Sequence, residues 1–388
     1  MNNDIPQNKK ALFWLSGGHF INDIYTGMLN PIMPFIAAKI GISMAVATVI
    51  LTISHIFSSL LQPVFGFFAD SMLKRAFIFW GLILSSVFIP HSVVSLNIFL
   101  LVLFISIGSL GSSLFHPQAL GLASKLSSGL DSGKTIAVFL AMGTLGYSFG
   151  PILSSSVSQY FGMDNMPLLS LIGIVWAFIM FLFVPKFSGK KDENIEKPLF
   201  REAFKKILSN HKLNILNIIA MLKSMIQSSC FILLPFLWKS IGHKPVYIGC
   251  ALFMFIFAGG ISSLVSSYAE KKIGARNVFY ISMILTLPLM ILFVLTYKNY
   301  PILSLFIFVL MGFVTMFATP VTMLMAQNVL PEYRSIISGF INGFSWGIVA
   351  IAMSLLGFVA ENFGITNVLI GVATIPAVCS VLVKHLFK

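Results

Sequence analysis

The feature that most constrains this chain is a series of apolar segments, each about 20 residues long, separated by short polar breaks. In hydrocarbon every backbone amide must be hydrogen-bonded within the protein, so such segments are predicted to be membrane-spanning helices. We count about twelve, over residues 11–38, 43–69, 76–95, 97–123, 134–160, 166–186, 213–238, 245–269, 277–297, 301–327, 336–361 and 366–386. The sequence therefore predicts an all-α membrane protein.

The composition excludes a water-soluble globular protein. Of the 388 residues, 57% are hydrophobic and only 10% are charged, whereas soluble domains carry about 25% charged residues. The three cysteines, Cys230, Cys250 and Cys379, lie in apolar runs and are expected to be inert packing residues. A cleaved signal peptide is not expected, because the first apolar segment continues beyond signal-peptide length with Asp23 inside it.

The distribution of charge predicts the orientation in the membrane. The net charge is +13, and 20 of the 25 basic residues fall in alternate loops and both termini, on one predicted face. Short cytoplasmic loops retain Lys and Arg, so both termini and the central loop are predicted to be cytoplasmic in a multi-pass protein of the cell (inner) membrane. This pattern explains the charge without a nucleic-acid partner.

The only long polar stretch divides the predicted helices six and six. We expect a six-helix bundle over 1–187, a cytoplasmic loop over 188–211 and a second six-helix bundle over 212–388. Positions about 200 residues apart correspond, since Gly143 pairs with Gly343 and the intramembrane Asp23 with Lys223. Two pseudo-symmetric halves are typical of transporters whose site lies at the midplane between them.

Polar side chains recur at helical spacing in the first and fourth predicted helix of each half. They are His19, Asn22, Asp23, Thr26 and Asn30; Ser106, Ser109, Ser113 and His116; Lys223, Ser224, Gln227 and Ser228; and Thr315, Thr319 and Thr322. Such stripes either line a polar path or bond to their own and neighbouring helices. The segments 166–186, 277–297 and 366–386 are nearly featureless and are predicted to face lipid.

The charged members of these stripes carry the functional interpretation. An Asp or Lys at the membrane centre costs about 2.5–3.5 kcal/mol on insertion scales, so it persists where it is paired or faces water. Asp23 and Lys223 are therefore candidate functional residues, the alternative being a structural ion pair. His19 and His116 are candidates as well, although a histidine hydrogen-bonded within a bundle needs no such role.

A charged turn motif follows the second predicted helix, and a glycine series lies in the fifth. Gly66, Asp70, Lys74 and Arg75 are spaced as a cytoplasmic latch, echoed after the eighth helix by Glu270 and Arg276. The alternative is ordinary positive flanking charge. In the fifth helix, Gly143, Gly146, Gly150 and Pro151 are spaced to let another helix pack closely and to kink their own helix.

These motifs resemble those of the major facilitator superfamily. The turn is similar to its loop 2–3 gate motif, with Leu73 where a second glycine is usual, and the glycine series resembles its antiporter motif, which favours export. At a finer level the chain resembles the fosmidomycin resistance protein family. The matching stretches are His19-Phe-Ile-Asn22-Asp23, Ser58-Ser59-Leu60-Leu61-Gln62-Pro63-Val64, Ser112-Ser113-Leu114-Phe115-His116-Pro117, Lys223, Ala326-Gln327 with Leu330-Pro331, and Ser338-Gly339-Phe340.

The resemblance implies a proton-coupled exporter, an antiporter of a small polar or amphiphilic compound such as a phosphonate-type antibiotic or a metallophore. Two positions depart from the family pattern, Gln118 and Asn328, where acids are usual, and this shifts the weight of proton coupling onto Asp23. We expect Asp23, His19 and His116 to couple protons. The expected substrate-binding residues are Asn22, Lys223, Gln227, Tyr147 and Asn342.

Substrate binding can either favour or oppose the protonation of Asp23, and this leaves import by symport open as an alternative to export by antiport. An anion at Lys223 would favour protonated Asp23, which is the linkage of a proton symporter that imports a small organic anion. Antiport requires proton and substrate to exclude one another, as a cation or metal chelate at Asp23 would. An intramembrane enzyme is not expected, since neither a nucleophile and base pair nor an H-E-x-x-H motif occurs. The sequence predicts no cofactor and no metal site. It predicts a monomer that contacts membrane lipids, small-molecule substrate and protons.

Overall fold

The computed structural model describes residues 9–62, 65, 75–127, 132–185 and 200–387, and its regular elements there are all helical. Ten helical stretches in these ranges are long and apolar enough to span a membrane, and Met44–Leu60 is a shorter apolar helix. The chain divides into two compact units. Unit 1 contains residues 1–43, 53–192 and 244–253, and unit 2 contains residues 44–52, 193–243 and 254–388.

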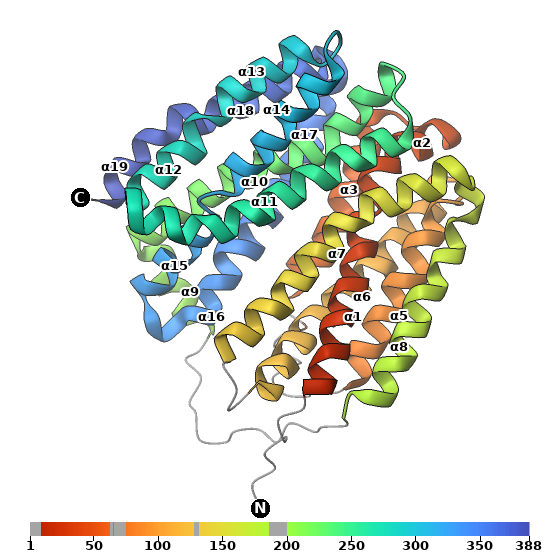
Figure 1. Ribbon diagram of the computed structural model, residues 1–388, viewed down its shortest axis with the longest axis horizontal. Coiled ribbons are helices and arrows are strands. Elements are labelled where there is room, and N and C mark those ends of the chain that lie inside the picture. The colour runs from red at the N-terminus through yellow and green to blue at the C-terminus, as the bar shows by residue number, and fades with distance from the viewer. Residues whose placement is uncertain (1–8, 63–64, 66–74, 128–131, 186–199, 388) are drawn as a thin grey trace, which may run out of the picture. The chain divides into compact units, whose positions relative to one another are not determined.

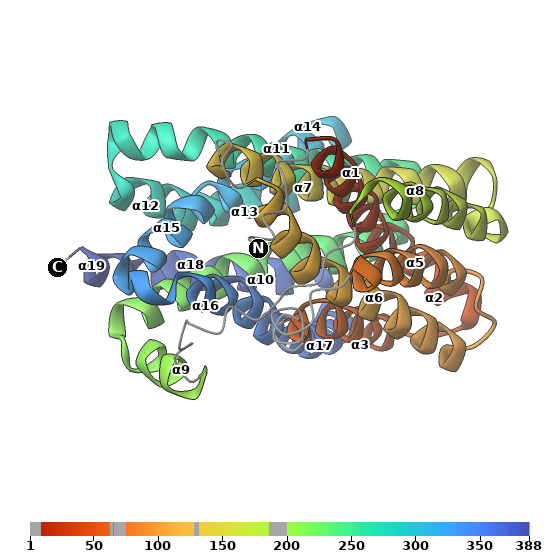
Figure 2. The same cartoon turned by 90° about the horizontal axis from the view of Figure 1, so that it is seen from below.

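Unit 1 is built around its first helix. Its elements are α1 (Lys9–Gly27), α2 (Leu29–Ile40), the end of α3 (Met44–His55), η1 (Ile56–Leu60), α5 (Arg75–Ser92), α6 (Ile98–Leu126), α7 (Ser132–Tyr160), η2 (Met163–Leu169) and α8 (Ser170–Phe183). Helix α1 packs against α5, α6, α7 and α8, and α5 packs along α6 (Figures 1 and 2). Residues of α1 thus contact α2, α5, α6, α7 and α8.

Unit 2 has α10 (His211–Ser240) in the corresponding position. Its other elements are α9 (Phe200–Ser209), most of α11 (Pro245–Ile273), α12 (Ala275–Ile284), α13 (Thr286–Thr296), α14 (Pro301–Met316), α15 (Thr319–Val329), η3 (Pro331–Tyr333), α16 (Arg334–Gly339), η4 (Phe340–Phe344), α17 (Ser345–Phe363), α18 (Ile365–Cys379), η5 (Ser380–Leu382) and α19 (Val383–Leu386). Helix α10 packs against α14, α15, α17 and α18, and most of its side chains are buried.

Proline explains where the predicted spans are interrupted. The span predicted over 11–38 is two helices, α1 and α2, because Pro31 has no N–H to donate to the carbonyl of Gly27. Pro288 and Pro320 likewise follow the breaks between α12 and α13 and between α14 and α15. The span predicted over 43–69 corresponds to α3 and η1, and its remainder falls largely outside the described residues. A count of twelve spans therefore remains a prediction.

Two short segments group differently from the predicted division at residues 187 and 211. Residues 44–52 belong to unit 2, where the Thr52 hydroxyl donates to the Ala350 carbonyl over 2.8 Å. Residues 244–253 belong to unit 1, where the Val246 amide donates to Gln159 Oε1 over 3.1 Å. Each unit thus includes the start of a helix whose remainder belongs to the other unit.

The helices predicted to face lipid expose large apolar side chains. Leu171, Phe178 and Leu295, on α8 and α13, are 59%, 59% and 69% exposed, and Val378 on α18 is 69% exposed. Apolar side chains exposed in this number are expected where the surrounding medium is hydrocarbon rather than water. The polar stripes of α1 and α10 are buried instead.

Candidate functional site

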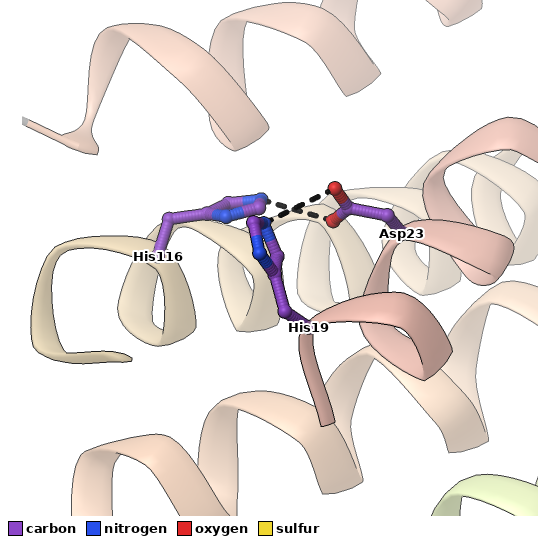
Figure 3. Close-up of side chains that lie close together, drawn as sticks. All are labelled: His19, Asp23 and His116. Carbon is purple, nitrogen blue, oxygen red and sulfur yellow. Dashed lines mark ion pairs between the residues drawn. The ribbon is translucent and has the colours of Figure 1, made fainter. Parts of the chain in front are cut away.

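A carboxylate and two imidazoles converge inside unit 1. Asp23 Oδ2 lies 3.3 Å from His19 Nε2, one helical turn away on α1, and Asp23 Oδ1 lies 3.3 Å from His116 Nε2 on α6. Figure 3 shows the three side chains pointing toward one another. The side chains of Asp23 and His19 are only 13% and 7% exposed, so the ion pairs lie largely away from solvent.

The backbone of α7 fixes the orientation of His19. Its Nδ1 lies 2.9 Å from the carbonyl oxygen of Phe139, and its ring stacks on the Phe139 ring with centroids 4.4 Å apart. A carbonyl oxygen only accepts hydrogen bonds, so Nδ1 carries a hydrogen and donates it. In the neutral imidazole this places the free lone pair on Nε2, the atom that faces Asp23.

Asn22 joins the cluster from the adjacent position on α1. Its Nδ2 donates to Asp23 Oδ1 over 3.0 Å and to Ser112 Oγ over 3.3 Å, and it lies 3.5 Å from His116 Nε2. Asn22 is fully buried, and its Oδ1 has no hydrogen-bond partner among the described residues. The expected substrate-binding residue Asn22 thus contacts two of the three expected proton-coupling residues.

The glycine series of α7 lies directly against these residues. A Cβ on Gly143 would contact the His19 imidazole and come within 2.8 Å of Asp23 Oδ2. A Cβ on Gly146 or Gly150 would meet the backbone carbonyls of Phe20 or Ile24. The series therefore brings α7 against α1 at the level of the cluster. Tyr147, half-buried on the same helix, hydrogen-bonds Asn30.

Lys223 occupies a separate buried position in unit 2. It is 3% exposed, and its Nζ donates to the Thr319 hydroxyl over 3.2 Å. Gln227, one turn further along α10, is 5% exposed. No carboxylate forms an ion pair with Lys223 within the described ranges. An ammonium has three N–H donors, and the Thr319 hydroxyl accepts only one of them, so Lys223 has donors available for a further acceptor.

Most hydroxyls of the predicted stripes bond within or between helices. Ser109 bonds Ser54 over 2.7 Å, and Ser113 donates to the Phe57 carbonyl, which fixes α6 to α3 and η1. Thr315 and Thr322 donate to carbonyls of their own turns. For these residues the structure favours the helix-packing alternative rather than a polar path.

The turn motif is only partly described. Gly66, Asp70 and Lys74 lie outside the described residues. The side chain of Asn342, an expected substrate-binding residue, also lies outside them, although its backbone is part of η4. The Arg75 guanidinium donates to the carbonyls of Phe181 and Val184 over 2.8 and 2.7 Å and lies over the Phe181 ring. Arg75 therefore caps the end of α8.

The echo of that motif in unit 2 is arranged differently. Glu270 is half-buried near the end of α11, and the Arg276 guanidinium lies 5.7 Å from the centroid of the Tyr280 ring. No ion pair joins Glu270 to Arg276 in the part of the chain that is described. The two motifs thus share charges at matching positions without sharing contacts.

Comparison with known proteins identifies the family. The family model of the Major Facilitator Superfamily matches residues 15–237 and again residues 216–388. The chain belongs to the major facilitator superfamily. The members of this superfamily found among solved structures and characterised relatives are transporters, so the chain is a multi-pass membrane transporter and not an enzyme.

Relatives within the superfamily confirm the finer resemblance. The fosmidomycin resistance protein of Escherichia coli (strain K12) is 24% identical over 362 residues, covering 90% of this chain and 86% of that protein. The uncharacterized MFS-type transporter YfnC of Bacillus subtilis (strain 168) is 23% identical over 375 residues, covering 92% and 88%. A solved bacterial homolog of the human lysosomal transporter Spinster has a TM-score of 0.79 at 14% identity, covering 97% of each chain.

Sequence reasoning did not single out two contributors to the site. Ser112 accepts from Asn22, yet in the sequence it is one of many helix serines and lies outside the stripe of Ser109, Ser113 and His116. Phe139 contributes a backbone carbonyl, which every residue has, so no sequence signal marks it. Both depend on how α1, α6 and α7 pack.

Proposed function

We propose that the protein is a proton-coupled secondary active exporter of a small polar or amphiphilic compound, such as a phosphonate-type antibiotic or a metallophore, working by alternating access. The observation that carries the proposal is the carboxylate of Asp23, 13% exposed, which is held between the imidazoles of His19 and His116. The efflux direction is supported by similarity to a fosmidomycin resistance protein and by the glycine series of α7.

The donor and acceptor arrangement supports a proton at this cluster. Since His19 Nδ1 donates to the Phe139 carbonyl, a neutral His19 would turn a lone pair toward an ionised Asp23. Two acceptors 3.3 Å apart with no hydrogen between them repel each other, so a proton on either group converts the contact into an attractive one. We therefore assign proton coupling to Asp23, His19 and His116.

The remaining expected residues are assigned by position. Asn22 and Tyr147 would contact substrate near the cluster in unit 1, and Lys223 and Gln227 would do so in unit 2, with Asn342 as a further candidate. The gate motif of Gly66, Asp70, Lys74 and Arg75, with Glu270 and Arg276, would act at the cytoplasmic end. The transporter would be a monomer in the inner membrane with both termini cytoplasmic, surrounded by lipid.

A growth screen with an uncoupler tests the function. Cells expressing the chain are exposed to phosphonates, metallophores and amphiphilic drugs, and accumulation of each protective hit is measured with and without the uncoupler. The proposal predicts tolerance with lowered accumulation that the uncoupler abolishes. Tolerance that persists in the uncoupler would contradict proton coupling, and raised accumulation would contradict export.

A second candidate function is proton-coupled import of a small organic anion. Lys223 favours it, because a buried ammonium with hydrogen-bond donors in excess of one hydroxyl partner is suited to a carboxylate or phosphonate. Flux measured in right-side-out against everted vesicles separates the two functions. Accumulation in right-side-out vesicles with an inward proton gradient would favour import.

A further inference from the structure

The ligand atoms of His19, Asp23 and His116 form a compact group of a kind that the sequence did not predict. One nitrogen from each imidazole and one carboxylate oxygen all lie within 4.8 Å of one another. Two of the residues are one turn apart on α1, while the third comes from α6, 93 positions after Asp23. All three side chains converge on a common point in Figure 3.

The spacing of these atoms suits an ion shared between them. Each Nε2 lies 3.3 Å from its carboxylate oxygen, and a direct charge-assisted hydrogen bond is shorter, about 2.7–2.9 Å. Ligand atoms about 2.1 Å from one ion, at tetrahedral angles, lie about 3.4 Å apart. The two contacts run to different oxygens of the Asp23 carboxylate, Oδ2 and Oδ1, and each has the length of an edge in a metal coordination shell.

The hydrogen bond from His19 Nδ1 leaves the lone pair of its Nε2 directed at that point. His19 donates from Nδ1 to the Phe139 carbonyl, which leaves Nε2 as the ligand atom. The Asn22 amide nitrogen donates to Asp23 Oδ1 over 3.0 Å, and a bound ion would replace its longer contact of 3.5 Å to His116 Nε2. Metal-binding histidines characteristically bond a carbonyl or carboxylate through their other nitrogen, and ligating carboxylates are themselves hydrogen-bonded.

We propose that His19, Asp23 and His116 bind a divalent transition-metal ion, which is the cargo or the charged centre of a chelated cargo. Two imidazoles with one carboxylate favour Zn²⁺, Co²⁺, Ni²⁺ or Fe²⁺ over Mg²⁺ and Ca²⁺, which prefer sites made of oxygen. Three protein ligands leave a coordination position open for a water molecule or for a donor atom of a small chelator. The role as cargo rests on the proposed exporter function, whereas the binding of the ion does not.

A metal ion at this site would compete with protons, as antiport requires, whereas an anionic substrate would favour protonation of Asp23. A metal binds imidazole nitrogens and carboxylates only when they are free of protons, so ion and proton exclude each other at these three residues. An outward-moving ion and an inward-moving proton can then alternate at one place. No second cation site is needed for exchange.

Binding is tested on the purified full-length chain without any gradient. Co²⁺ is titrated optically and displaced by Zn²⁺ in the wild type, in Asp23→Asn, in His116→Gln and in the control His55→Gln, a half-buried histidine of unit 1 outside the cluster. We expect a single bound ion per chain. Removal of either ligand should weaken binding by at least about tenfold, the lower end of the loss caused by removing an outer-shell partner, while His55→Gln should bind like the wild type.

A second measurement covers variants that fail to fold. X-ray absorption at the zinc edge of the wild type should show two imidazole ligands and light oxygen or nitrogen scatterers. Equal binding in all four proteins, or a zinc spectrum without imidazole, would overturn the site even if the chain exports other compounds. Ion binding that depends on the cluster, without gradient-driven efflux, would support the site and contradict the exporter.

A transport measurement shows whether the ion is carried free or within a complex. Everted vesicles receive radioactive Zn²⁺ as the free ion or as a complex with free histidine, and the label taken up is compared between the wild type and His116→Gln. Uptake of either form that is lost in His116→Gln supports the ion as cargo and identifies the form carried. Uptake unchanged by His116→Gln would contradict it.

Discussion

The imidazole of His19 on α1 is held by a hydrogen bond of 2.9 Å from its Nδ1 to the backbone carbonyl of Phe139 on α7. A backbone carbonyl cannot be removed by a side-chain substitution, so the orientation of His19 is tied to the position of α7 itself. Any displacement of α7 along α1 would rotate or release the imidazole that faces Asp23. The packing of α7 on α1 and the chemistry of the cluster are therefore linked through this bond, together with the stacking of the Phe139 ring on His19.

Gly143→Ala should disturb the cluster, since the added methyl group would enter the space of the His19 ring and Asp23 Oδ2. Overpacking of this kind costs about 1–3 kcal/mol. We expect a lower melting temperature and impaired transport. Gly343→Ala is the matched control, because a Cβ there meets nothing within 4 Å. Equal effects of the two substitutions would contradict the close packing of α7 against the cluster.

Arg75→Ala should destabilise the protein by removing the two hydrogen bonds that cap the end of α8. The expected loss is about 1–3 kcal/mol, measured as a fall in the thermal unfolding midpoint. Arg75→Lys should recover only part of it, because both bonds come from the single nitrogen Nη1, which an ammonium can replace, whereas the planar guanidinium that lies over the Phe181 ring is lost. Full recovery by Lys would show that charge alone matters at this position.

Lys223→Met should weaken transport of anionic compounds more than that of neutral ones, since it removes the buried ammonium and preserves much of the side-chain volume. The measurement is the half-saturating concentration for an anionic and a neutral substrate in vesicles. Thr319→Val serves as the companion variant, because it removes only the hydroxyl that Lys223 contacts. Equal losses for both substrates would assign Lys223 a structural role.

Hydropathy predicted the helices well because burial in lipid imposes length and apolarity on each span. Ten predicted spans correspond to the ten helical stretches of sufficient length, and Pro31, Pro288 and Pro320 each come shortly after an interruption between two helices. The twelve-helix count depends on the predicted spans 11–38, which divides into α1 and α2, and 43–69, whose end the structure describes only in part. Membrane-spanning helices can therefore be predicted from local sequence, because the backbone N–H and C=O groups of each helix bond within that same helix.

The sequence named His19, Asn22, Asp23 and His116 as candidates, but it did not predict the contacts among them. Sequence spacing placed His19 and Asp23 on one face, but His116 reaches Asp23 through the packing of α6 on α1, which no periodicity encodes. The correspondence of Gly143 with Gly343 likewise hid a difference, since only Gly143 lies against other side chains. Contacts between residues on helices that are far apart in the sequence can be identified only from the three-dimensional structure.

The most direct test of the account is proton movement in Asp23→Asn. Proteoliposomes containing a pH-sensitive dye are given an exported substrate, and the proton flux it elicits is compared with the wild type and with Asp164→Asn, which alters a carboxylate that is 89% exposed. The account predicts that Asp23→Asn folds but elicits no substrate-driven proton flux, while Asp164→Asn behaves like the wild type. Undiminished flux in folded Asp23→Asn would contradict the account.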